Sequence, residues 1–157
     1  MGKGRAWASV ITLAAALGVS ACVRSDVASL RTDPGLAYEF RTALSFDKAY
    51  EIAIQGFTRC LTGSVLRSTL AIHPEIDREH GTASIAYLQH SFRSGYWATV
   101  DFAASGSQTN IKVNTIDNPG VAKLGPELEK WIGGSTECAV GAFIDNHYPL
   151  IELEKES

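Results

Sequence analysis

The most regular hydrophobic pattern in the chain lies between residues 45 and 61. Apolar side chains recur there at steps of three and four residues, the spacing that places them on one face of an α-helix. Ser45 stands at the N-cap position, and Asp47 suits the positive end of the helix dipole. We therefore predict a helix whose buried face is formed by Phe46, Ala49, Tyr50, Ala53, Phe57 and Cys60.

Apolar and polar residues alternate in several stretches before and after this helix. Such alternation is typical of strands that have one covered face. Residues 37–44 predict a short strand ahead of the helix, and the strands expected after it are 68–77, 82–90, 96–104 and 110–116. Within 96–104 the expected inward side chains are Tyr96, Ala98, Val100 and Phe102.

A second helical pattern begins near Pro126, a residue that suits a first helical turn. Its apolar set is Leu124, Leu128, Trp131 and Ile132. The element order β-α-β-β-β-β-α predicts an α+β fold, with an antiparallel sheet of about four to five strands and two helices packed on one face. Over residues 37–138 this order loosely resembles the helix-grip domain of some outer-membrane-assembly lipoproteins, in element order only. We assign residues 39–150 to this single domain and expect the acidic end, 151–157, to be a mobile tail.

The first 22 residues have the pattern of an export signal. Lys3 and Arg5 precede an uncharged, mostly apolar run over 6–21, as in a secretory signal peptide. The run ends in Val19-Ser20-Ala21-Cys22, which resembles the lipobox of bacterial lipoproteins. The resemblance implies removal of residues 1–21, a diacylglyceryl group on the thiol of Cys22, and acylation (for example with palmitate) of the new amine. An ordinary secretory leader and an uncleaved N-terminal anchor are the alternatives.

The lipobox resemblance also carries a location. Acyl chains on Cys22 would hold the protein on a lipid bilayer without a spanning helix. In proteobacterial lipoproteins an Asp after the lipidated cysteine commonly retains the protein at the inner membrane, and here that position is Val23. The resemblance therefore implies an outer-membrane anchor facing the periplasm, with the inner membrane and surface display left open. Residues 22–38 are expected to be the lipidated N-terminus and a tether of about 20 Å reach, or in part to pack on the domain.

Three cysteines are an odd number for an exported chain. Lipidation of Cys22 leaves Cys60 and Cys138, which we expect to form a disulfide in an oxidising compartment. Closing a loop of about 79 residues would stabilise the fold by roughly 4.5 kcal/mol in the chain-entropy model. Two separate buried thiols are the alternative.

Charge and motifs exclude some classes of function. The formal net charge is −3, and the basic residues are scattered, whereas a nucleic-acid binder normally has a basic face. The chain has no Walker loop and no dinucleotide fingerprint, so no cofactor is expected. His90 and Ser91, with Asp101 on a neighbouring strand, include the residue types of a catalytic triad. Without a nucleophile motif, we interpret His90 and Asp101 as surface residues.

The acidic stretch over residues 72–80 contains the residue types of a metal site. If residues 72–80 are extended, four potential ligands share one face: His73, Glu75, Asp77 and Glu79. Adjacent same-face positions are about 6.5 to 7 Å apart, so two neighbours could share an ion but all four could not. Pro74 allows the strand only at a sheet edge, where charges also prevent aggregation. We therefore interpret the stretch as a solvated edge and expect no metal.

The best candidate for a contact surface is Trp97, which alternation places on the face opposite Val100 and Phe102. Exposed tryptophans are enriched at binding hot spots, and Thr99 and Asp101 share this face. We expect a membrane-tethered periplasmic lipoprotein that is not an enzyme. It would act as an accessory or binding module with an envelope protein as its partner. The alternative is a small envelope hydrolase or ligand carrier with a pocket between helix and sheet.

Overall fold

The computed structural model describes residues 24–65, 68–91 and 94–139. The predicted signal peptide, Cys22 and the predicted acidic tail lie outside this range. Within it the chain forms three helices and a sheet of six antiparallel strands in the order β1-β6-β5-β4-β3-β2. The helices are α1 (Val27–Thr32), α2 (Phe46–Cys60) and α3 (Leu124–Ile132), and the strands are β1 (Leu36–Thr42), β2 (Gly63–Val65), β3 (Ser68–Asp77), β4 (Thr82–His90), β5 (Gly95–Ser105) and β6 (Gln108–Thr115).

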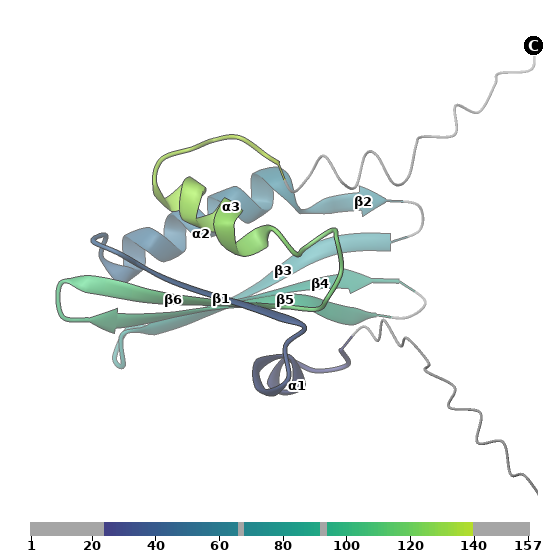
Figure 1. The fold of residues 1–157 in the computed structure, drawn as a ribbon, viewed down its shortest axis with the longest axis horizontal. Helices are drawn as coiled ribbons and strands as arrows, with labels where there is room; N and C mark the ends of the chain where they lie inside the picture. The colour runs from purple at the N-terminus through teal and green to yellow at the C-terminus, as the bar shows by residue number, and fades with distance from the viewer. Residues whose placement is uncertain (1–23, 66–67, 92–93, 140–157) are drawn as a thin grey trace, which may run out of the picture.

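The predicted α+β fold is confirmed. Two helices, α2 and α3, lie together on one face of the antiparallel sheet (Figure 1). Strands β3 and β4 have the predicted bounds, and α3 begins two residues ahead of Pro126. Two elements were not predicted, namely the three-residue β2 at a sheet edge and the six-residue α1 on the opposite face (Figure 1).

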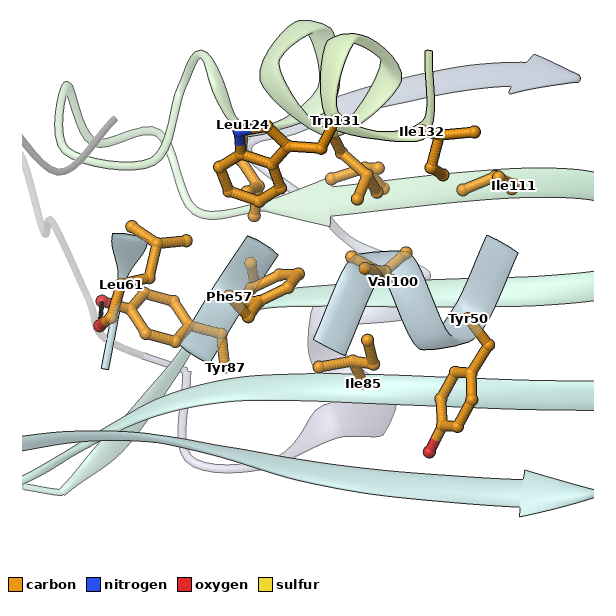
Figure 2. Close-up of a cluster of buried hydrophobic side chains, with 14 of the residues drawn as sticks. Tyr50, Phe57, Leu61, Ile85, Tyr87, Val100, Ile111, Leu124, Trp131 and Ile132 are labelled. Atoms are coloured by element: carbon orange, nitrogen blue, oxygen red, sulfur yellow. Dashed lines mark hydrogen bonds between the residues drawn. The ribbon is translucent and has the colours of Figure 1, made fainter. Parts of the chain in front are cut away.

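The core fills the space between the sheet and the two long helices (Figure 2). The buried face of α2 is the predicted one, and Phe57 lies between two other rings, Trp131 of α3 and Tyr87 of β4. Gly56 lets α2 and α3 approach closely, because a Cβ there would lie 2.4 Å from a ring carbon of Trp131. The alternative function places its pocket between helix and sheet, a layer in which the described structure has the core side chains.

The Cys60–Cys138 disulfide is confirmed, with the two Cα atoms 5.3 Å apart. It joins the end of α2 to the segment that follows α3. The indole N–H of Trp131 donates to the backbone oxygen of Glu137 at 2.8 Å, next to this bond. The covalent link and the hydrogen bond together hold the α3 end against α2.

Residues 24–38 pack on the domain. The expectation of a free tether is therefore wrong for this described part of residues 22–38, and the alternative, that the stretch packs on the domain, applies. Asp26 caps α1 by accepting a hydrogen bond from the backbone N–H of Ser29, which lowers the pKa of Asp26. Leu30 is fully buried, and α1 contacts β5 and β6. Arg24 adds a backbone bridge, its oxygen accepting from the N–H of Tyr96 at 2.9 Å.

Candidate ligand-binding groove

A groove of about 880 Å³ lies on the face of the sheet that carries α1. It crosses five strands near the hairpin turns of β3–β4 and β5–β6, and Arg31 of α1 borders it. Two rows of side chains line the groove, and each row runs across the strands with one residue from each strand. Between the two rows, the backbone of one further residue per strand forms the floor. Because side chains alternate along a strand, the middle residues point to the helix side, and these are Phe40, Ile111, Phe102, Ala83 and Ile76.

The row nearer α1 is set by the strand register. Each of its residues lies directly opposite the next on the neighbouring strand: Glu39 (β1), Lys112 (β6), Asp101 (β5), Ser84 (β4) and Glu75 (β3). Two ion pairs hold the middle of this row. Arg31 contacts Asp101 at 2.5 Å, and Lys112 contacts Glu39 at 3.0 Å.

The second row lies two residues further along each strand, about 6.5 to 7 Å from the first. It consists of Arg41, Asn110, Ala103, Thr82 and Asp77. Hydrogen bonds from the backbone N–H and the ring of His80 lower the pKa of Asp77, so this carboxylate stays ionised. The side-chain oxygen of Asn110 is buried and has no hydrogen-bond partner in the described structure.

Charge is distributed unevenly along the groove. Arg41 and Lys112 lie at the β1/β6 end, where only Glu39 opposes them, while Glu75 and Asp77 lie at the β3 end. Among the described residues neither Arg41 nor Glu75 has an ion-pair partner. The groove therefore has a cationic end and an anionic end, each with one unpaired charge.

The predicted contact surface of Trp97, Thr99 and Asp101 is wrong as an exposed patch. A β-bulge shifts the register, since Tyr87 lies opposite Ala98 whereas Leu88 lies opposite Tyr96. Trp97 is the extra residue, and it packs half-buried against the helix-side core. A bulge breaks the alternation on which the prediction depended.

The other two residues of that surface are on the predicted face, but α1 covers it in part. Thr99 is fully buried, and its hydroxyl accepts a long hydrogen bond of 3.4 Å from the side chain of Asn114. Asp101 is half-buried and paired with Arg31. Of the three predicted contact residues, only Asp101 lines the groove.

The acidic stretch on β3 is an edge over most of its length, as interpreted. Beyond Leu70, β3 pairs only with β4, so its other side is a sheet edge, the position at which a strand tolerates Pro74. No group of three His, Cys, Asp or Glu residues able to hold a metal occurs in the described part of the chain. His73 is exposed, and its ring centroid is 6.0 Å from that of His90.

The triad-type residues do not come together. His90 lies opposite Thr69, whereas Asp101 lies opposite Ser84, six residues from His90 along β4. Six residues of strand span about 20 Å, far beyond hydrogen-bond reach.

Sequence reasoning missed the basic part of the groove, namely Arg31, Arg41 and Lys112. The available signal was weak: each is a charged residue on the polar face of a predicted strand, or in a stretch assigned to the tether. Nothing in one strand says which residue of another will lie opposite it.

Comparison with known proteins adds no assignment, because no protein-family model, no curated protein and no solved structure matches this chain. None of the helices in the described residues is long and apolar enough to cross a membrane.

Proposed function

We propose that this protein is a lipid-anchored lipoprotein of the bacterial envelope whose domain is a non-enzymatic binding module. The groove beside α1 is its binding site. The observation that carries the binding role is the groove itself, since ligand sites are hollows in which a small number of placed polar groups converge from several elements.

Two features support the envelope location. The disulfide between Cys60 and Cys138 is a bond that persists in oxidising compartments such as the periplasm. The sequence before Arg24 has the form of an export signal that ends in a lipobox-like motif.

The packed N-terminal segment changes the geometry expected of the anchor. Cys22 is only two residues from Arg24, which is bridged to β5, and two residues span at most about 7 Å. A lipid on Cys22 would therefore hold the domain close to the bilayer on its α1 side. A ligand would reach the groove from within the envelope, near the membrane surface.

The anchor is tested by the intact mass of the protein extracted from membranes. We expect loss of residues 1–21 and the added mass of acyl chains. A chain that retains the leader, or that begins at residue 22 without lipid, would overturn the lipoprotein assignment.

The binding role is tested by crosslinking in living cells. A photo-reactive amino acid is placed at Ala103, an exposed residue in the second row of the groove. In a matched control it is placed at Thr58, an exposed residue of α2 on the other side of the sheet. We expect a discrete adduct from position 103 and none from position 58. No adduct at 103, or the same adducts at both positions, would rule out the groove as the site.

A further inference from the structure

The charge layout of the groove specifies a ligand more closely than its volume does. We propose, building on the proposed binding function, that the groove takes a short extended peptide segment with a positive charge at one end and a negative charge at the other. Its positive end lies over Glu75 and Asp77 on β3, and its negative end lies over Arg41 on β1.

The unpaired charges select the ends of this ligand. Lys112 and Arg31 are already neutralised by Glu39 and Asp101, so Arg41 is the cation left to bind a carboxylate. Asp77 contacts His80, and Glu75 has no ion-pair partner among the described residues. A uniformly anionic ligand would be repelled at the β3 end, and a uniformly cationic one at the β1 end.

The middle of the groove suits amide groups. Asn110 lines this part of the groove, and a side-chain amide can both donate and accept hydrogen bonds. Ser84 and Thr82 are hydroxyl side chains that can donate or accept, which suits a peptide backbone carrying both kinds of group. Ala103 is the only apolar side chain in the two rows, so polar and charged side chains form the rest of both rows.

The dimensions fit one extended strand of peptide. From β1 to β3 the sheet order runs through β6, β5 and β4, a path of four inter-strand steps or about 19 Å. At about 3.3 Å per residue this length accommodates roughly six residues. The space between the two side-chain rows, about 7 Å, is the width of a single chain rather than of two.

The experiment uses the full chain extracted from membranes and four fluorescent hexapeptides with the same neutral centre. One has lysine at one end and glutamate at the other, one has lysine at both ends, one has glutamate at both, and one is uncharged. We expect fluorescence anisotropy to show the tightest binding for the dipolar peptide, weakening as salt is raised.

Charge-reversal variants make the test specific. Arg41→Glu should weaken binding of the dipolar peptide by about tenfold, the loss of one charge-assisted contact, and should make the doubly cationic peptide the preferred one. Glu75→Lys should shift preference to the doubly anionic peptide. Arg59→Glu on α2 is the matched control, with the same change in net charge on an exposed residue of the other layer, and should leave the preference unchanged. A gain of preference for a new peptide cannot come from unfolding.

Equal binding of all four peptides, or a preference that Arg41→Glu does not move, would overturn the peptide assignment. If no peptide binds while position 103 still gives its adduct in cells, the ligand class is wrong and the binding role stands. If both experiments are negative, both proposals fail. Tighter binding of the doubly anionic or doubly cationic peptide to the unmodified chain would replace the dipolar ligand with one of a single sign.

Discussion

The face of the sheet under α2 and α3 and the face beside α1 are built from alternate residues of the same strands. On β5, Val100 and Phe102 are buried against the helices, while Asp101 and Ala103 between and beyond them line an open groove. The helix face is filled by apolar side chains (Figure 2), and part of the other face is an open groove with charged residues along it.

This difference assigns stability and binding to opposite sides of one sheet. A ligand on the helix side would have to displace tightly packed rings, whereas the groove offers space and polar groups at no such expense to the core. Substitutions on one face should therefore leave the property of the other face largely intact. The four predictions that follow test this separation.

The largest effect is expected at Trp131, whose ring is almost fully buried where α3 packs against α2 (Figure 2). Trp131→Ala should lower the free energy of unfolding by about 3–5 kcal/mol, because it leaves a cavity that the core cannot fill. Urea unfolding measures this, with Thr82→Ala in the second row of the groove as control, expected within about 0.5 kcal/mol of the unmodified chain. A Thr82→Ala effect as large as that of Trp131→Ala would show that the groove face carries the fold too.

A smaller effect is expected where the two helices touch. Alanine is favoured over glycine inside a helix by about 1 kcal/mol, but a Cβ at Gly56 would lie 2.4 Å from the ring of Trp131. The ring is held by Phe57 and by its bond to Glu137, so Gly56→Ala should destabilise by about 1–3 kcal/mol as an overpacked core. Thermal unfolding measures the sign. A higher melting temperature would mean that the contact between α2 and α3 can accommodate the added methyl group.

Burial of a tyrosine on the helix side of the sheet should also make the free energy of unfolding depend on pH in the alkaline range. Burial raises the pKa of Tyr87 far above its ordinary value, and its hydroxyl donates to the backbone oxygen of Leu61 at 3.0 Å. The unfolded chain ionises this phenol above about pH 10 and the folded chain does not, so stability is complete below pH 10 and is lost as pH rises beyond it. The loss should be about 1.4 kcal/mol per pH unit.

Tyr87→Phe separates this effect from other tyrosines, since burial also raises the pKa of Tyr50. The variant should lose about 1 kcal/mol at neutral pH with the missing hydrogen bond, and its stability should fall less steeply above pH 10. Unfolding in urea at pH 8 to 11 gives both quantities. Parallel curves for the two proteins would contradict the burial argument.

The helix face was the predictable part of the molecule. The spacing of Ala49, Ala53, Phe57 and Cys60 defines one side of a helix whatever it packs on, and the alternation in β3 and β4 gave their bounds. Hydrophobic periodicity is a local property, so one stretch of sequence is enough to show it.

The groove was not predictable in the same way, because it depends on register. That Lys112 lies opposite both Glu39 and Asp101 follows from the pairing of three strands, which no single stretch encodes. The bulge at Trp97 shows a second reason for a wrong prediction. Strict alternation placed the Trp97 side chain on the face away from the helices, but the extra residue of the bulge turns it to the helix side. Helix α1 was not predicted because it has only six residues and a single fully buried side chain, Leu30. A stretch this short shows no hydrophobic period.

The smallest effect is expected from the ion pair that closes the α1 side of the groove. Arg31 and Asp101 make three hydrogen bonds, yet their side chains remain 41% and 31% exposed. A double-mutant cycle with Arg31→Ala and Asp101→Ala should therefore give a coupling of only about 0–1 kcal/mol, decreasing further in high salt. A coupling above about 2 kcal/mol would mean that the pair is shielded from water and stabilises the fold as the core does. A weak coupling would instead place this pair among the solvated charges of the groove face, which contribute little to the stability of the fold.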